Sequence, residues 1–203
     1  MGADAVELDV RRTADGALVV HHDPKLADGR EILSVALGDL PAHVPTLDDA
    51  LDACGAMWVN VEIKNDPSEP DFDPTDGIAA VVAEALDTRS VPAKFLVSSF
   101  RRETIDAFRV VSPEIATAFL TADPGVATDL RLLDSLVQSG HRALHPWFGL
   151  VTEGLVTACH ECGIELNVWT CDDPLTMRKL ADWGVDGICT NVPDLALSTL
   201  RAA

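Results

Sequence analysis

Residues 5–23 read AVELDVRRTADGALVVHHD, and the rest of the predicted architecture follows from this segment. Glu7 and Asp9 stand one residue apart in an apolar run that is typical of a buried strand. Such strands seldom carry two carboxylates on one face unless a positive charge lies between them. The pair therefore indicates a face that binds a metal ion.

A hairpin is predicted around residues 15–16, because the next apolar run begins too soon after Val10 for a parallel crossover. Symmetric antiparallel pairing about this turn sets Val10 opposite Val19. The same register sets Glu7 opposite His22, and directly paired residues share a face of the sheet. We therefore expect a histidine beside the two carboxylates.

The remainder of the chain alternates short apolar runs with helical patterns, which is typical of a parallel sheet. Strands are predicted over residues 5–10, 58–64, 94–99, 115–120, 142–145, 164–170 and 186–190. Helices are predicted over residues 47–53, 76–86, 103–111, 129–139, 150–162, 174–183 and 193–200.

Seven strand–helix units are one fewer than the eight of a (β/α)₈ TIM barrel. We expect an α/β barrel that forms a single domain over residues 1–203, with the hairpin after its first strand. We further expect this barrel to be truncated at its N-terminus, so that one strand and one helix are absent. An open sheet, which needs no eighth unit, is the alternative.

Glu62 is a third carboxylate in a β-branched run, at the end of the second parallel strand. The carboxyl ends of parallel strands are where sites form in these folds. Converging carboxylates repel one another unless a cation binds them, and all-oxygen ligation suits Mg²⁺, Ca²⁺ or Mn²⁺. One divalent cation held by Glu7, Asp9 and Glu62 is our expectation. The alternative is that each acid forms an ion pair with Lys64, Arg11 or Arg12.

Composition excludes several other functions. The formal net charge of −18 argues against nucleic acid and anionic membranes as partners. No apolar run is long enough for a transmembrane segment, and no leader precedes residue 5, so we expect a cytoplasmic protein. Five cysteines are an odd number, which argues against a disulfide scaffold. The sequence CHEC at residues 159–162 lies on a predicted helix, where we expect a structural or surface role.

Several motifs together resemble the glycerophosphodiester phosphodiesterases, a family of (β/α)₈ barrels related to phosphoinositide phospholipase C. The resemblance covers essentially the whole chain. It rests on GADAVELDV (residues 2–10), TADG (13–16), VVHHD (19–23), PTL (45–47), EIK (62–64), SSF (98–100), WT (169–170) and GVDG (184–187).

This resemblance implies hydrolysis of glycerophosphodiesters, as small-molecule substrates, to sn-glycerol 3-phosphate and an alcohol. It implies that Glu7, Asp9 and Glu62 are metal ligands and that His22 is the general acid or base toward the leaving group. Further residues would bind the substrate: Lys64 at the phosphate, and Phe100 and Trp169 as walls around the glycerol. Ordinary barrel packing is the alternative for the two aromatic residues.

The sequence also departs from the family pattern. The family's first strand carries His-Arg-Gly, which supplies a second acid/base histidine, and this motif is absent here. A catalytically impaired fragment or paralogue that only binds metal or phosphate is therefore one alternative function. A lysophospholipase D-type enzyme is another. Open barrel edges would favour self-association.

Overall fold

The computed structural model describes residues 2–89, 91–125 and 129–201. The chain forms two compact units, which we call the N-terminal unit (residues 5–116) and the C-terminal unit (residues 117–203 together with the first four residues). Both alternate strands with helices, as the sequence predicts.

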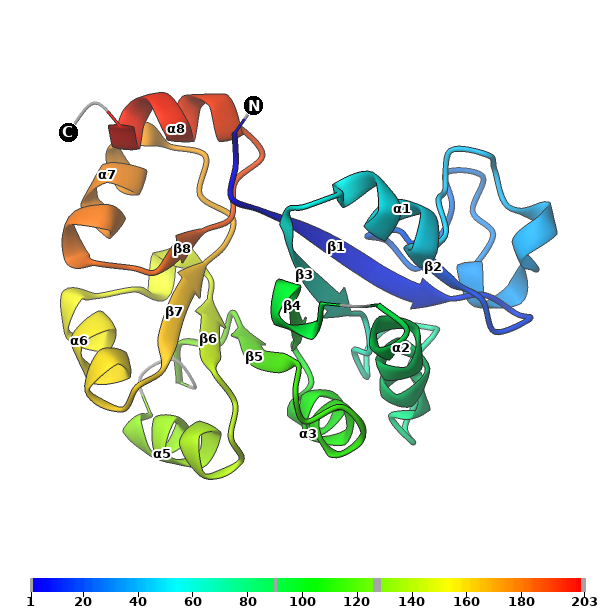
Figure 1. Ribbon diagram of the computed structural model, residues 1–203, viewed down its shortest axis with the longest axis horizontal. Helices are drawn as coiled ribbons and strands as arrows, with labels where there is room; N and C mark the ends of the chain where they lie inside the picture. Colours follow the sequence, from blue (N-terminus) through cyan, green and yellow to red (C-terminus); the bar gives the residue numbers. More distant parts are fainter. Residues whose placement is uncertain (1, 90, 126–128, 202–203) are drawn as a thin grey trace. The chain divides into compact units, whose positions relative to one another are not determined.

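The N-terminal unit is built on three parallel strands and one antiparallel strand, in the order β2-β1-β3-β4. Helices α2 and α3 lie side by side (Figure 1). The strands are β1 (Ala5–Arg12), β2 (Leu18–Val20), β3 (Trp58–Ile63) and β4 (Phe95–Ser99). The helices are α1 (Leu47–Cys54), α2 (Gly77–Asp87) and α3 (Arg102–Val111), with short 3₁₀ helices η1 (Ile32–Ser34), η2 (Leu37–Asp39) and η3 (Pro92–Lys94).

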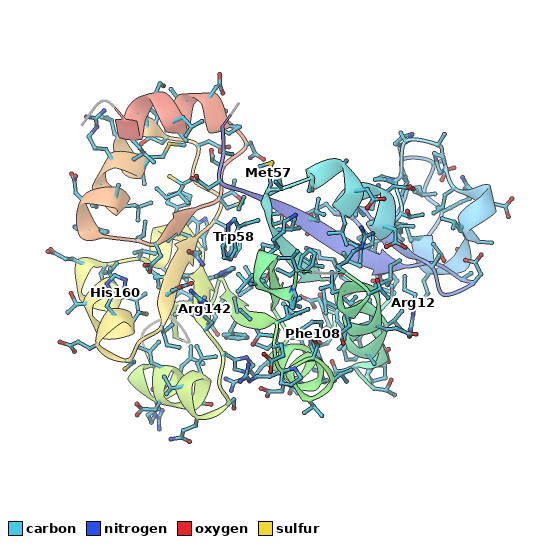
Figure 2. The ribbon with its side chains drawn as sticks, in the orientation of Figure 1. Arg12, Met57, Trp58, Phe108, Arg142 and His160 are labelled. Carbon is cyan, nitrogen blue, oxygen red and sulfur yellow. The ribbon has the colours of Figure 1, made fainter. Side chains whose placement is uncertain are left out.

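The core of this unit joins one face of the sheet to the three helices. Val61 in β3, Leu86 in α2 and Phe108 in α3 are all completely buried; Figure 2 labels Phe108. Thr46 is the N-cap of α1, because its hydroxyl accepts a hydrogen bond from the Asp49 amide at 3.1 Å. The packing fixes the three parallel strands and therefore the edge at which their carboxyl ends meet.

The hairpin is present, but its predicted register is wrong by one residue. Val10 pairs with Val20 rather than Val19. The turn takes up one residue more than symmetric pairing requires, because Thr13 N–H donates to Ala17 O and closes a five-residue loop. Gly16 occupies the left-handed region of this loop at φ 86°.

This shift also removes the predicted pairing of Glu7 with His22. Strand β2 ends at Val20, whose N–H points away from β1 and donates to Pro45 O. The next residue, His21, donates its N–H to Asp9 O. His22 consequently lies beyond the strand, and the sheet register does not determine its position.

The segment after the hairpin, residues 24–44, packs around a small core of its own with β2, in which Ile32 and Val19 are completely buried and Leu26 nearly so. Its apolar side chains thus stabilise the hairpin.

The C-terminal unit contains four parallel strands in the order β5-β6-β7-β8. They are β5 (Ala116–Thr121), β6 (Ala143–Pro146), β7 (Glu165–Val168) and β8 (Gly187–Ile188). The helices are α5 (Leu130–Gln138), α6 (Glu153–Glu161), α7 (Pro174–Trp183) and α8 (Pro193–Arg201), with the 3₁₀ helix η4 (Phe148–Leu150). Figure 1 shows α5, α6 and α7 on the same side of β6 and β7.

Helix α6 begins later than predicted. Residues 148–150 form η4, and the Thr152 hydroxyl then caps α6 by accepting from the Leu155 amide at 3.1 Å. His160 on this helix, labelled in Figure 2, lies 3.0 Å from the Asp186 carboxylate, consistent with a structural role for the CHEC sequence.

Candidate active site

Three carboxylates lie on one face of the sheet in the N-terminal unit. In the parallel pairing of β1 with β3, Asp9 is in register with Glu62, and Glu7 is two residues before Asp9. Side chains two residues apart on a strand share a face. One carboxylate oxygen from each of the three residues lies within 4.8 Å of the others. The predicted convergence of these acids is therefore present.

The same face carries further oxygen atoms. Asn60 is in register with Glu7, and Ser98 of β4 is in register with Glu62. Among the described residues, three buried side-chain atoms have no hydrogen-bond partner, namely Glu7 Oε1, Asn60 Oδ1 and Ser98 Oγ. Buried oxygens are normally paired. This concentration of unpaired acceptors suits an oxygen-seeking divalent cation such as Mg²⁺ or Ca²⁺.

Lys64 interacts with two of the three acids. Its Nζ lies 2.7 Å from Glu62 Oε1 and 3.3 Å from Asp9 Oδ1. Ion pairing with Lys64, the alternative to metal binding, is therefore present for these two carboxylates. It coexists with an unpaired oxygen on Glu7, so the lysine satisfies only part of the cluster.

Bringing the acids together in a buried place raises the pKa of two of them. Burial, together with the charges of Asp9 and Glu62, raises the pKa of Glu7 to about 8. Burial also raises the pKa of Glu62, an effect opposed by Lys64 and His22. Burial lowers the pKa of Lys64, but its two ion pairs outweigh this effect and raise it overall. A bound divalent cation would favour the charged form of each carboxylate.

The charge of His22 is the smallest of the influences on the pKa of Glu62 and acts to lower it. The imidazole is 75% exposed, and its Nδ1 lies 2.8 Å from Asp23 Oδ1. This hydrogen bond is the main reason that the pKa of Asp23 is lowered. A carboxylate beside Nδ1 favours the tautomer that carries the proton on Nδ1. The other ring nitrogen, Nε2, is not part of this hydrogen bond.

A cleft opens beside the cluster. Phe100, 37% exposed, follows β4, and the Lys64 ammonium lies 5.9 Å from the centre of its ring. The residues that line the cleft come from β3 and the segments after β3 and β4: Glu62, Ile63, Lys64, Asn65, Asp66, Glu69 and Phe100. An aromatic wall and a cation thus stand next to the carboxylates.

Trp169 belongs to the C-terminal unit, directly after β7. It is half-buried, and its indole N–H donates to His145 O at 2.8 Å. The Asn167 amide Nδ2 donates to His145 Nε2 at 2.9 Å, and burial lowers the pKa of His145 to about 4. Both residues stand at carboxyl ends of strands, and the role of Trp169 in substrate binding remains a prediction.

Sequence reasoning missed the contribution of Asn60 and Ser98. Parallel register between the acid-bearing strands would have placed Asn60 beside Glu7. It also treated Arg11 only as a counter-ion for the acids, whereas Arg11 binds Glu69 and Asp71. These ion pairs hold the acidic segment after β3 to β1.

Parallel strands with a cluster of carboxylates and a lysine beside a cleft define the class of the protein as an α/β protein with a candidate divalent-metal centre. The particular family follows from comparison with known sequences. The model of the glycerophosphoryl diester phosphodiesterase family matches residues 1–36 and 29–195. The chain belongs to this family, whose members are hydrolases.

Individual relatives agree with the assignment. A Mycobacterium tuberculosis protein named probable glycerophosphodiester phosphodiesterase 2 is 30% identical over 100% of this chain and 81% of its own length. A glycerophosphodiester phosphodiesterase of Caldanaerobacter subterraneus is 26% identical over 99% of this chain and 87% of its own length.

Solved structures share the fold. A phosphodiesterase from Oleispira antarctica, in complex with the product sn-glycerol-3-phosphate, superposes with a TM-score of 0.86 at 22% identity, covering 98% of this chain and 86% of that one. A glycerophosphodiester phosphodiesterase from Parabacteroides distasonis superposes with a TM-score of 0.81 at 24% identity. The superposition covers 98% of this chain and 84% of that one. The predicted (β/α)₈ barrel class is thereby confirmed.

None of the helices formed by the described residues has the length and apolar character needed to cross a membrane.

Proposed function

We propose that this chain hydrolyses glycerophosphodiesters to sn-glycerol 3-phosphate and an alcohol with the help of a divalent cation. The observation that carries the proposal is the convergence of Glu7, Asp9 and Glu62 within 4.8 Å, in a chain of the glycerophosphoryl diester phosphodiesterase family. The product bound to the Oleispira antarctica relative supports the choice of substrate.

Glu7, Asp9 and Glu62 would hold the cation. All three offer hard oxygen ligands, so Mg²⁺ or Ca²⁺ is the expected ion, with Mn²⁺ as a third candidate. The unpaired Glu7 Oε1 supports this assignment, because an ion would supply the partner that the atom lacks. A cation held by these residues would supply Lewis-acid chemistry at a phosphoryl oxygen and at a hydroxyl nucleophile.

The overall reaction consumes one water molecule. In the net reaction the water oxygen becomes bonded to phosphorus, the bond from phosphorus to the oxygen of the alcohol breaks, and the water gives up one proton to solvent. His22 donates a proton to that leaving oxygen, so the alcohol departs neutral. Lys64, which lies at the cleft, offsets the negative charge of the phosphoryl group. Phe100, at the cleft, would contact the glycerol moiety, and substrate binding by Trp169 stays a prediction of the family resemblance.

Three expectations about the whole protein remain predictions: a single domain over residues 1–203, a cytoplasmic location and self-association through open sheet edges. Size-exclusion chromatography with light scattering would test the last of these. A monomer at micromolar concentration would contradict it.

A substrate panel tests the proposed function. With Mg²⁺ or Ca²⁺, the protein should release glycerol 3-phosphate from glycerophosphocholine and show little release of choline from lysophosphatidylcholine. The reverse preference would identify a lysophospholipase D-type enzyme instead. If the protein binds the metal but hydrolyses neither compound, it is a chain that binds metal or phosphate without catalysis. The folded segment at residues 24–44 buries its apolar side chains and so offers little surface for a lipid tail.

A further inference from the structure

Arg11 is a completely buried charged residue in the middle of the N-terminal unit. Burying an unpaired charge costs several kcal/mol, so such a residue must be compensated. Every one of its five N–H donors has an acceptor. Nε and Nη2 donate to His22 O at 3.0 and 2.6 Å, Nη1 and Nη2 donate to Glu69 at 2.9 and 3.0 Å, and Nη1 also donates to Asp71 at 2.7 Å.

These contacts join two segments that lie outside the strands. His22 follows His21, whose N–H donates to Asp9 O of β1, and the His22 carbonyl itself is bound by the Arg11 side chain. Glu69 and Asp71 belong to the segment after β3, and Glu69 also lines the cleft beside Lys64. The guanidinium therefore connects the backbone of the proposed acid to the wall of the cleft in which the substrate would lie.

The neighbouring Arg12 provides a contrast within the same strand. Its side chain is 31% exposed and makes one longer contact, 3.4 Å, to Asp73 of the same acidic segment. Figure 2 labels Arg12. The two arginines thus share a residue type, a strand and a partner segment, but only Arg11 binds the main chain of His22.

We propose that Arg11 is a positioning residue for hydrolysis, which holds the main chain of His22 and the Glu69–Asp71 segment in one fixed arrangement. The proposal rests on the proposed function, in which His22 protonates the leaving oxygen. A general acid must lie within hydrogen-bond reach of that oxygen, and small displacements reduce its contribution steeply. Buried ion pairs contribute little net stability compared with apolar residues, so stability alone does not account for Arg11.

The test compares two substrates of different leaving group in the full-length protein loaded with Mg²⁺ or Ca²⁺. Choline leaves glycerophosphocholine as an alkoxide that needs a proton, whereas the p-nitrophenyl ester of glycerol phosphate releases an anion that does not. Arg11→Met should lower kcat for the choline ester about 10- to 100-fold, part of the full effect of a general acid. For the nitrophenyl ester, the same substitution should lower kcat by a factor of less than about three. KM for both substrates and the affinity for the metal should stay nearly unchanged.

The matched control is Arg12→Met, which should leave kcat for both substrates near the wild-type value. His22→Asn provides the reference pattern of substrate-selective loss. If Arg11→Met fails to fold, Asp71→Asn keeps the shape of the acceptor while weakening the pair, and should show the same selectivity with a smaller loss.

Equal losses on both substrates, or no loss, in a folded variant would overturn the role of Arg11. That outcome is distinct from a failure of the proposed function, in which the wild-type protein itself would hydrolyse neither substrate. A selective loss with Arg11→Met, absent from Arg12→Met, supports the proposal.

Discussion

The ammonium nitrogen of Lys64 lies 2.7 Å from Glu62 Oε1 and also within 3.3 Å of Asp9 Oδ1. Lys64 thus supplies positive charge to two carboxylates that a divalent cation would bind as well. We infer that cation binding would weaken these ion pairs and leave the ammonium available to a phosphate group in the cleft.

Replacing Lys64 by methionine should therefore have two separate effects. The metal-free protein should melt at a lower temperature, because the acids lose their counter-ion, and adding Mg²⁺ should restore more stability than in the wild type. KM for glycerophosphocholine should rise about tenfold or more, since an ion pair to phosphate is lost. Thermal melts with and without metal, together with steady-state kinetics, measure both.

Lys25→Met is a suitable control for this variant, because Lys25 is 55% exposed and pairs with Glu31 away from the cluster. Its melting temperature and KM should stay near the wild-type values. An unchanged KM in Lys64→Met would contradict a phosphate-binding role.

Glu7→Gln should weaken divalent-cation binding by at least about tenfold, because affinity depends on the number of charged ligands. Isothermal titration calorimetry with Mg²⁺, Ca²⁺ and Mn²⁺ measures the effect and ranks the three ions. Glu84→Gln, an exposed position on α2, serves as a control that should bind like the wild type. If the Glu7 variant bound the cations as tightly as the wild type, Glu7 would not be a metal ligand.

His22→Asn should lower kcat for glycerophosphocholine about 10²- to 10⁴-fold, the usual contribution of general acid–base catalysis. The control is His21→Asn, since the His21 ring contacts only the exposed carbonyl of Asp23 in the interactions observed for it. Steady-state kinetics should show a small effect for His21. Comparable losses in the two variants would argue against His22 as the acid.

The metal-free protein should lose stability as pH rises. The pKa of Glu7 is raised to about 8 in the folded protein, from 4.5 in an unperturbed chain. The folded state thus retains a proton that the unfolded chain releases, and this stabilisation is lost as pH rises through about 8. The melting temperature should fall between about pH 5 and pH 8, and Mg²⁺ should reduce or reverse the trend.

Glu7→Gln should flatten this pH dependence in the absence of metal, although the raised pKa of Glu62 contributes in the same direction. Melting curves at a series of pH values, in buffer containing a chelator, provide the measurement. A metal-free melting temperature that rises steadily over this range would contradict the described electrostatics.

Much of the fold and the acid cluster could be predicted because periodicity and strand spacing carry the information. Glu7 and Asp9 share a face by the period of a strand, and Glu62 reaches them through parallel register. The bounds of α7, Pro174–Trp183, match the prediction because Asp173 caps its start and Gly184 ends it.

The position of His22 could not be derived in the same way. Two side-chain hydrogen bonds decide the turn, from Ala17 N to Thr13 Oγ1 and from Thr13 Oγ1 to Asp15 Oδ1, and they lengthen it by one residue. A one-residue change reverses the face of every paired side chain. The carbonyl of His22 is then bound by the Arg11 side chain, a tertiary contact that local sequence patterns do not encode.

The most direct test of the central claim measures release of glycerol 3-phosphate from glycerophosphocholine by the purified protein. Three samples are compared: wild type with Mg²⁺ or Ca²⁺, wild type with excess chelator, and Glu7→Ala with the same metal. We expect turnover in the first sample and at least about a hundredfold less in the other two. Turnover that survives both the chelator and Glu7→Ala, or its absence from the metal-loaded wild type, would contradict the account.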